Sequence, residues 1–453
     1  MKLFGSNGVR GVANEEFTLE LASSLAASAG SLLGKEIGVG RDGRTTSPMF
    51  RDAIVSALLS IGCNVHDFGL ITTPGLQFMV RERGLDGGVM VTASHNPPQF
   101  NGVKMIYNDG VEVPKSLEAE IEALVTKGGP PKCEWNEVGS VYYHEYIDTY
   151  TDSVISHVDV KAIKDAGLSV ALDLGNGAAM LTAPVVASKL GCKLYTINTE
   201  IDGSFPGRGS EPTPDNLVDL KKLIKATGSN LGIGYDGDGD RAIIIDENAK
   251  AVWGDKTLSL VAQEFMKTHS GETLVTAISS SQSIEDVVAK YGGKVHWTKV
   301  GSVLVSRAMV ENGYRIGGEE NGGIMYGPHL EVRDGSMVLA LMLHYIATRK
   351  MPLSELIAEQ PNLFKNKDKT PCPNHLKEEV LERLVTKVDA PEINTMDGVK
   401  LVYDDGSWIL FRPSGTEAIF RLYAESISEK RVRELIDSHK AIVKKVVDEL
   451  SAA

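Results

Sequence analysis

The chain has 453 residues, of which 42% are hydrophobic and 24% are charged, and its formal net charge is −13. This length and composition are typical of a globular protein of three or four domains, and no apolar run is long enough to cross a membrane. The negative charge argues against a general nucleic-acid-binding surface, and it restricts any site for an anionic substrate to a local cluster of cations.

Cysteine usage and the N-terminus indicate the compartment. The four cysteines are far apart in the sequence and fit neither a disulfide framework nor a metal-ligand spacing. The first residues, Met1 to Ser6, lack the features of a signal peptide. We therefore expect a protein of the reducing cytoplasm.

The N-terminal part of the chain alternates predicted helices and strands. Apolar residues recur with helical spacing over 18–34 and 49–61, and short apolar runs at 37–40, 65–68 and 88–91 predict strands. This alternation predicts an α/β fold with a mostly parallel sheet.

Two polar segments of this region have the chemistry of anion sites. Residues 4–11 are rich in glycine and contain Arg10; they form either a nest of backbone amides for an anion or a flexible terminal turn. Residues 92–97 follow an apolar strand and contain Ser94 and His95. They form either an ordinary turn that ends the strand or a site at the sheet edge, where α/β proteins bind ligands.

The next predicted strand, residues 101–107, carries Lys104 between apolar residues and ends at Asn108-Asp109-Gly110, a strong hairpin signal. A buried lysine can have a lowered pKa and carry a proton. An ordinary edge-strand lysine is the alternative interpretation.

The plan of strand, glycine turn and helix recurs along the chain. It appears at 168–179, and a strand and a helix follow the same plan over 273–291. This indicates three copies of one α/β plan, although no sequence repeat proves it. Residues 361–375, which are rich in Lys, Asn and Pro, predict a linker to a last domain with strands at 408–411 and 419–423.

The strongest chemical signal is an acidic loop in which Asp236, Asp238 and Asp240 alternate with glycines and precede Arg241. Three carboxylates so close together repel one another unless a cation lies among them, and hard oxygen ligands favour Mg²⁺. An EF-hand is disfavoured because Arg241 occupies the place of the required glycine. A dinucleotide site is discarded because the aspartates would repel a pyrophosphate. A solvated acidic turn is the remaining alternative.

Two later glycine-containing loops have the composition of ligand-binding turns. Residues 317–323 place carboxylates and an amide on a glycine loop; these groups suit sugar hydroxyls, or the segment is a plain polar loop. Residues 412–417 combine serine, glycine and threonine with Arg412, and Arg421 follows. This segment is either a phosphate cradle or a simple turn between two strands.

Taken together, four segments resemble the signatures of the α-D-phosphohexomutase family: a phosphoserine loop, a metal loop, a sugar loop and a phosphate loop. They occur in the family's order across the whole chain, which looks most similar to the archaeal-type phosphoglucosamine mutases and phosphomannomutases. The segments are Thr92-Ala93-Ser94-His95-Asn96-Pro97, Asp236-Gly237-Asp238-Gly239-Asp240-Arg241, Gly318-Glu319-Glu320-Asn321-Gly322-Gly323 and Arg412-Pro413-Ser414-Gly415-Thr416-Glu417.

The resemblance implies a fold and a domain organisation. Three similar α/β domains with mixed sheets and a smaller α+β C-terminal domain would form a heart shape around a central cleft. The implied intervals are 1–149 for a phosphoserine domain, 150–251 for a metal-binding domain, 252–362 for a sugar-binding domain and 363–453 for a phosphate-binding domain.

The resemblance also implies an enzyme that interconverts hexose 6-phosphate and hexose 1-phosphate through a phosphoserine and a bisphosphate intermediate. It implies one Mg²⁺ per chain, a hexose 1,6-bisphosphate activator and a phosphorylated hexose substrate, with neither nucleic acid nor membrane as a partner. Glucosamine 6-phosphate is the favoured substrate because an amino sugar is cationic and Glu319 and Glu320 are adjacent carboxylates. Mannose and glucose phosphates are the alternative. The rival functions are a non-catalytic sugar-phosphate-binding module and a metal-dependent phosphatase.

Individual residues receive roles from the resemblance. Ser94 carries the phosphoryl group, and Lys104 is the candidate base because arginine barely titrates. The family's sugar loop commonly ends Ser-Gly-His, but here it ends Asn321-Gly322-Gly323, and His329 either replaces that histidine or does not. The other roles are as follows: Arg10, His95 and Arg241 act beside the reacting phosphate; Asp236, Asp238 and Asp240 hold Mg²⁺ together with Ser94; Glu319 and Asn321 contact sugar hydroxyls; and Arg412, Ser414, Gly415, Thr416 and Arg421 hold the non-reacting phosphate.

Overall fold

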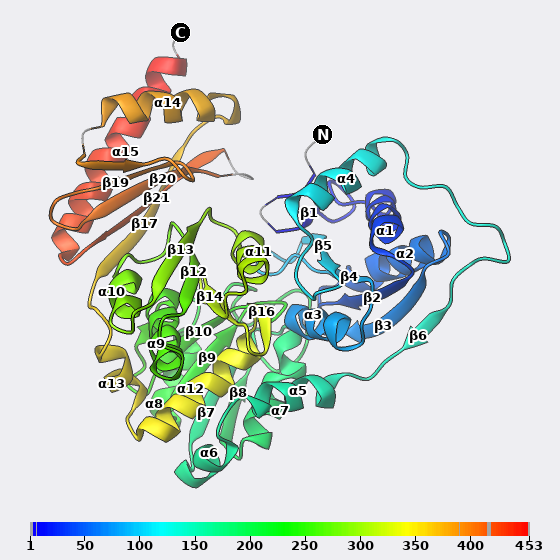
Figure 1. Cartoon of the computed structure of the whole chain (residues 1–453), viewed down its shortest axis with the longest axis horizontal. Helices are drawn as coiled ribbons and strands as arrows, with labels where there is room; N and C mark the ends of the chain where they lie inside the picture. The colour runs from blue at the N-terminus through cyan, green and yellow to red at the C-terminus, as the bar shows by residue number, and fades with distance from the viewer. Residues whose placement is uncertain (1–2, 6, 389, 415–417, 452–453) are drawn as a thin grey trace.

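The computed structural model describes residues 3–5, 7–388, 390–414 and 418–451. Over these residues the chain forms four sheets, and we call the units built on them the first to the fourth domain. Figure 1 shows these domains following one another around an arc, from the first in blue to the fourth in orange and red. The sheets use residues 9–143, 169–252, 273–333 and 364–426, so each interval expected from the sequence contains one sheet. The exact domain limits stay predictions.

The first domain is a six-stranded mixed sheet in the order β1-β5-β4-β2-β3-β6, with helices on both faces. Helices α1, α2 and α4 share one apolar cluster with alternate strand residues, and α3 packs in a second cluster. Helix α1 lies close to α2 because its small residues allow it; a Cβ at Gly30 would lie 2.6 Å from a Leu58 methyl carbon. The elements are β1 (Val9–Val12), α1 (Leu19–Leu33), β2 (Glu36–Arg41), α2 (Ser47–Leu59), β3 (Asn64–Leu70), α3 (Thr73–Glu82), β4 (Gly87–Val91), β5 (Phe100–Tyr107), α4 (Lys115–Thr126) and β6 (Val141–Tyr143).

The second domain has a five-stranded sheet in the order β11-β10-β9-β7-β8. Strand β7 is parallel to both β8 and β9, and β10 is antiparallel to β9. All residues of β9 and β10 are buried, as expected for strands covered on both faces. The elements are α5 (Ile147–Ser156), α6 (Val160–Ala166), β7 (Ser169–Asp173), η1 (Ala178–Leu181), α7 (Ala183–Lys189), β8 (Lys193–Ile197), α8 (Val218–Thr227), β9 (Leu231–Tyr235), β10 (Ala242–Asp246) and β11 (Ala251–Val252).

The third domain repeats this topology in the order β13-β12-β14-β15-β16. Strand β12 is parallel to both β13 and β14, and β15 is antiparallel to β14. The elements are α9 (Gly254–Thr268), β12 (Thr273–Ala277), α10 (Ser283–Ala289), β13 (Lys294–Thr298), α11 (Ser302–Asn312), β14 (Ile316–Gly318), β15 (Ile324–Tyr326), β16 (Leu330–Arg333), α12 (Gly335–Arg349) and α13 (Leu353–Ala358).

The same short connection between two neighbouring strands recurs in each of the three α/β domains. In each sheet a parallel strand leads through a short loop into an antiparallel neighbour: β4 into β5, β9 into β10, and β14 into β15. Ser94, the three aspartates and Glu319 lie in these three loops. The expected three copies of one plan are therefore present, and they offer their polar residues from equivalent positions.

The fourth domain is smaller and has an antiparallel sheet in the order β17-β21-β20-β19-β18. Its apolar cluster is separate from the one that extends from α3 through the second and third domains. The elements are β17 (Phe364–Pro371), η2 (Asn374–Leu376), α14 (Lys377–Lys387), β18 (Glu392–Asn394), β19 (Val399–Val402), β20 (Trp408–Pro413), β21 (Ile419–Ser426) and α15 (Glu429–Ser451). Three α/β domains with mixed sheets and a smaller C-terminal α+β domain confirm the expected fold class.

The prediction of a linker over residues 361–375 is wrong for most of that segment, although the third domain does join the fourth there. Residues Phe364–Pro371 form β17, which pairs with all eight residues of β21. The segment is polar because β17 is an edge strand whose side chains are mostly exposed, and lysines are common on such strands. Its composition was therefore that of an exposed strand and not of a flexible connection.

Among the residues that the structure describes, no helix combines the length and the apolarity needed to cross a membrane.

Candidate active site

Ser94 lies directly after the buried strand β4, in the first of the three equivalent loops. Its backbone has φ +52°, a left-handed conformation that is unusual for a residue other than glycine and that often marks functional sites. The Ser94 N–H donates to Thr92 Oγ1 at 2.8 Å, which supports this turn. The hydroxyl donates to Asp236 Oδ2 at 2.8 Å, so the side chain points from the first domain at the acidic loop of the second.

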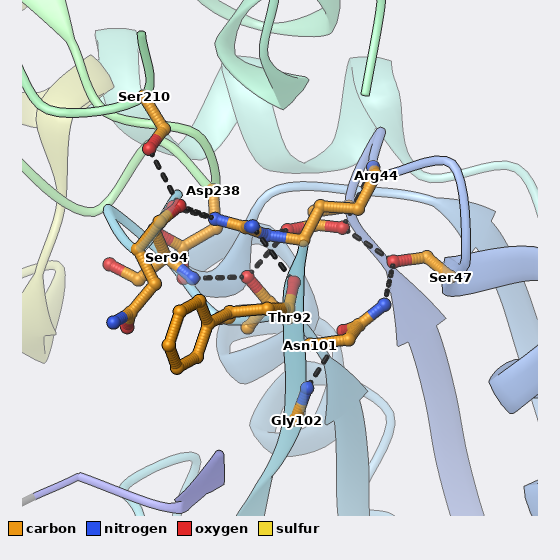
Figure 2. Close-up of polar contacts among 12 residues, drawn as sticks. Arg44, Ser47, Thr92, Ser94, Asn101, Gly102, Ser210 and Asp238 are labelled. Carbon is orange, nitrogen blue, oxygen red and sulfur yellow. Dashed lines mark hydrogen bonds and ion pairs between the residues drawn. The ribbon is translucent and has the colours of Figure 1, made fainter. Parts of the chain in front are cut away.

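Arg44 holds the Ser94 loop in shape. Its guanidinium is buried, forms an ion pair with Asp42 at 3.1 Å, and donates to the backbone carbonyls of Ser94 (2.8 Å) and Asn96 (2.7 Å). Figure 2 shows Arg44 reaching the loop from the segment between β2 and α2, opposite Ser94. Further bonds run to the carbonyls of Pro97 and Phe100. A planar group with five donors is therefore the support that fixes the turn.

We expect Arg44→Lys to loosen this loop. A lysine keeps the charge beside Asp42 but cannot reach four carbonyl oxygens at once, so buried acceptors lose their partners. The free energy of unfolding should fall by about 3 kcal/mol, and hydrogen exchange over residues 93–97 should accelerate. Arg83→Lys, at the exposed end of α3, is the matched control. Equal exchange in both variants would contradict the role of Arg44.

The acidic loop brings its three carboxylates together in the buried interior. Asp236, Asp238 and Asp240 each offer an oxygen within 4.8 Å of the others, the one such group found among the described residues. The loop approaches Ser94 closely because Gly237 lacks a side chain; a Cβ there would lie 2.7 Å from the Ser94 carbonyl oxygen. One carboxylate of the cluster, Asp236, thus contacts the serine hydroxyl, and the other two lie close to it.

The donor set fits a divalent cation with oxygen ligands. Asp238 Oδ1 and Asp240 Oδ1 are buried and accept no hydrogen bond from any described group. Burial, followed by the charges of Asp240 and Asp238, raises the pKa of Asp236 well above its ordinary value. Orphaned carboxylate oxygens and mutual repulsion are what a bound Mg²⁺ would relieve.

Two cations already flank the cluster. Lys104 Nζ lies 2.7 Å from Asp238 Oδ2 and 2.9 Å from Asp240 Oδ2, and Arg333 also forms an ion pair with Asp240. Burial lowers the pKa of Lys104, but Asp238 and Asp240 outweigh it, so the pKa is raised. These contacts hold Lys104 as an ammonium group. Its action as a general base stays a prediction, because it must first release a proton against two carboxylates.

Arg10, His95 and Arg241 lie around the same centre. Arg10 donates from Nη1 to the Ala93 carbonyl (3.0 Å) and to Asn96 Oδ1 (2.8 Å), and burial lowers its pKa to about 10. Arg241 and then burial lower the pKa of His95, which keeps the imidazole neutral. His95 Nδ1 lies 3.5 Å from Ser94 Oγ. Arg241 Nε lies 3.9 Å from Asp240 Oδ1, so two arginines and a neutral histidine lie around the Ser94 loop and the acidic loop.

The sugar loop directs its two glutamates in opposite directions. Glu319 forms an ion pair with Arg333 at 3.3 Å, on the side of the acidic loop. Glu320 instead forms an ion pair with Lys367 on β17 of the fourth domain. Burial raises the pKa of Glu320, but Lys367 and Lys365 lower it more, so the carboxylate is charged. The two glutamates therefore do not face one sugar together. Of the two carboxylates expected to favour an amino sugar, only Glu319 lies on the side of the acidic loop.

The phosphate loop joins β20 to β21 at the end of a hairpin. Arg412 and Arg421 occupy directly paired positions on these strands, so their side chains leave the same face. Ser414 N–H donates to the Ile419 carbonyl at 2.9 Å, which closes the hairpin. Gly415 and Thr416, also expected to hold phosphate, lie outside the described residues.

His329 does not lie at the acidic loop. It is buried between domains, stacked on Phe78 with ring centroids 5.2 Å apart, and its Nδ1 lies 3.2 Å from Ser153 Oγ. Its Nε2 also lies 3.3 Å from Asp334 Oδ2, so its contacts are those of a buried side chain, and nothing among the described residues shows it in place of the histidine missing from the sugar loop. Asn321, the other residue expected to contact sugar, uses Oδ1 to accept the Gly323 N–H at 3.1 Å.

Sequence reasoning missed three residues of this site. Arg44 and Arg333 are buried arginines that bond to the Ser94 loop and to the acidic loop, and Thr73 donates to Asp238. An Arg-Asp-Gly-Arg run after β2 was the available signal for Arg44. No local pattern signals Arg333, because its partner Asp240 is far away in the sequence.

Comparison with protein families gives matches along nearly the whole chain. Residues 1–131, 148–250 and 253–364 match the phosphoglucomutase/phosphomannomutase alpha/beta/alpha domains I, II and III, and residues 365–441 match the C-terminal domain of the same family. These four matches follow the order of the four sheets.

Individual relatives agree with the family matches. The chain is 40% identical over 443 residues to a phosphoglucomutase/phosphomannomutase of Thermococcus kodakarensis, covering 96% of this chain and 97% of the relative. It is 39% identical over 451 residues to a phosphoglucosamine/phosphogalactosamine mutase of Sulfurisphaera tokodaii, covering 98% and 99%. The solved structure of a phosphoglucomutase/phosphomannomutase family protein from Burkholderia thailandensis superimposes with a TM-score of 0.88 at 26% identity, covering 98% and 97%. Because all four domains of the family match in order and a full-length relative is 40% identical, the chain belongs to the phosphoglucomutase/phosphomannomutase family, and it is an enzyme of the phosphohexomutase class.

Proposed function

We propose that this enzyme converts glucosamine 6-phosphate to glucosamine 1-phosphate through phosphorylated Ser94. The observation that carries the proposal is the Ser94 hydroxyl, 2.8 Å from Asp236 in a cluster of three buried carboxylates. A serine held against a metal-type donor set suits phosphoryl transfer, which depends on charge neutralisation and in-line positioning. Names of relatives support the substrate class, and mannose and glucose phosphates remain the alternative.

The proposed reaction has two transfers. In the first, the bond from phosphorus to Ser94 Oγ breaks and Oγ takes up a proton, while a bond from phosphorus to the sugar O1 forms and the O1 proton leaves to a base. The product is a hexose 1,6-bisphosphate with Ser94 unmodified. After the sugar reorients, the bond from phosphorus to O6 breaks and O6 takes a proton, while a bond to Ser94 Oγ forms and the Ser94 hydroxyl gives up its proton; the hexose 1-phosphate then departs. A hexose 1,6-bisphosphate would phosphorylate an unmodified Ser94 by the same chemistry, which is the reason for the proposed activator.

Each loop has a separate duty in this proposal. Asp236, Asp238 and Asp240 would hold Mg²⁺, which when bound neutralises charge on the phosphoryl group. Arg10, His95, Lys104 and Arg241 would act beside that group, and His95, which is neutral, would add no charge there. Glu319 and Asn321 would orient the sugar. Arg412, Ser414 and Arg421 would hold the phosphate that does not react, as would Gly415 and Thr416.

A substrate panel tests the assignment. We expect kcat/KM for glucosamine 6-phosphate to equal or exceed the values for mannose 6-phosphate and glucose 6-phosphate at the same Mg²⁺ and activator concentrations. Since Glu319 is the carboxylate left on the active-site side, Glu319→Gln should reduce kcat/KM more for the cationic amino sugar than for the neutral sugars. Glu320→Gln is the matched control, because Glu320 forms its ion pair with Lys367 of the fourth domain.

A preference of tenfold or more for mannose or glucose, equivalent to about 1.4 kcal/mol, would overturn the amino-sugar assignment and leave the mutase assignment standing. Release of free phosphate without isomerised sugar would favour a phosphatase instead.

A further inference from the structure

Asp397 lies at the junction of the third and fourth domains, in the turn between β18 and β19. The next residue, Gly398, has φ +91°, and a Cβ there would lie 2.0 Å from the Phe411 carbonyl oxygen. Glycine is therefore required at this turn. Strand β19 starts opposite Phe411, since Val399 pairs with it, and Gly398, which precedes it, lies close to the Arg412 backbone, so the neighbouring Asp397 can reach the Arg412 side chain.

One carboxylate oxygen of Asp397 bonds to both domains. Asp397 Oδ2 accepts the Val300 N–H at 2.9 Å and Arg412 Nε at 2.7 Å. Val300 belongs to the loop that connects β13 to α11 of the third domain. Both side chains of the ion pair are mostly buried, with 17% of Arg412 and 19% of Asp397 exposed, so the bridge is only partly screened by solvent.

The bridge fixes the direction of a guanidinium that has several donors. A carboxylate bond at Nε holds the plane of the group, while its Nη hydrogens lie along other edges of the fork. A phosphate is best bound by two parallel N–H donors, and such binding requires the fork to be correctly oriented beforehand. Asp397 is the group that supplies this orientation.

We propose that Asp397 is a positioning residue that orients Arg412 for the substrate's non-reacting phosphate and ties that arginine to the third domain. The inference rests on the proposed function, since it assumes that Arg412 binds that phosphate. In this arrangement the loop around Val300 helps to hold Asp397 in place through the Val300 N–H.

Other contacts hold the two domains together without Asp397. Ile278 packs with Trp408, Leu410 and Tyr423 in one apolar cluster. Lys365 forms an ion pair with Asp255 at 2.7 Å, and the Gln282 N–H donates to Glu425 Oε1 at 3.0 Å. Loss of the Asp397 charge should therefore leave the protein folded and the domains docked, so that its effect reports on Arg412.

The test is Asp397→Asn, which has the same size and lacks the charge. Binding of a phosphate that does not react stabilises the ground state and the transition state equally, so KM should rise about tenfold while kcat changes by less than about twofold. Asp397→Glu should recover part of the loss. The control is Asp405→Asn, because Asp405 forms a comparable ion pair with Arg431 at 3.1 Å in another turn of the same domain. Unchanged KM, or a fall in KM, in Asp397→Asn would overturn the proposal.

Two readouts do not need turnover, and they separate this inference from the proposed function. Hydrogen exchange at the Val300 amide should accelerate in Asp397→Asn and not in Asp405→Asn. Titration with inorganic phosphate should give a weaker affinity in Asp397→Asn than in wild type. If the wild type isomerises no hexose phosphate, the proposed function fails, and phosphate affinity still decides the role of Asp397. Equal exchange at Val300 and equal phosphate affinity in the two variants would refute it.

Discussion

Replacing Ser94 with alanine should lower turnover by at least about 1,000-fold, because the hydroxyl is the proposed acceptor and donor of the phosphoryl group. Alanine also removes the hydroxyl bond to Asp236 but keeps the Ser94 backbone contacts to Thr92 and Arg44. Substrate should therefore still bind. Mass spectrometry of the active wild type should find one phosphoryl group, on the peptide that contains Ser94.

The matched control for this prediction is Ser204→Ala. Ser204 is an exposed serine whose hydroxyl bonds to Asp202 in its own turn. It should keep normal turnover and the same phosphorylated peptide. Full activity in Ser94→Ala, together with an active wild type that never carries phosphate on that peptide, would remove the covalent step from the mechanism.

Asp238→Asn should weaken Mg²⁺ binding and reduce turnover by at least about 100-fold at a fixed Mg²⁺ concentration. The change removes one anionic oxygen from the carboxylate cluster and leaves Lys104 with Asp240 as its remaining ion-pair partner. Calorimetric titration with Mg²⁺ measures the binding loss without reference to activity. Raising the Mg²⁺ concentration should recover part of the turnover.

Asp246→Asn provides the comparison for the metal. Asp246 is a buried carboxylate at the other end of β10, where it accepts N–H groups of its own turn from Asn248 and Lys250. Its replacement should leave Mg²⁺ affinity unchanged. Undiminished turnover in chelator-treated wild-type protein would eliminate the cation from the reaction.

The parts of the site that could be predicted are those in which the chemistry is local in the sequence. Ser94 stands in a single hexapeptide, and the three aspartates alternate over five residues, so their shared duty is visible without a fold. The α/β plan was also predictable, since apolar strands alternate with helical patterns. The third copy of this plan, over residues 273–291, shows the same alternation of strand and helix, so it could be recognised without knowledge of tertiary contacts.

The parts that could not be predicted depend on contacts between distant segments. Arg333 and Asp240 meet only when β16 and the acidic loop are folded, and Arg44 reaches Ser94 from fifty residues away. Glu319 and Glu320 look equivalent in the sequence, yet in the turn after β14 Glu319 pairs with Arg333 and Glu320 pairs with Lys367 of the fourth domain. The strand β17 was mistaken for a linker because an exposed edge strand and a loop share the same polar composition.

The equivalent position of the three loops has a consequence for how such an enzyme can diverge. A single ancestral module, copied twice, would present the same turn three times, and each copy could then specialise: one for a transferable group, one for a cation and one for a carbohydrate. Because each turn is anchored by its own strand pair, β4 with β5, β9 with β10 and β14 with β15, changes in one leave the other two registers intact. Under the proposed roles, selection for a new sugar would act on the β14–β15 turn while the transfer chemistry is inherited unchanged.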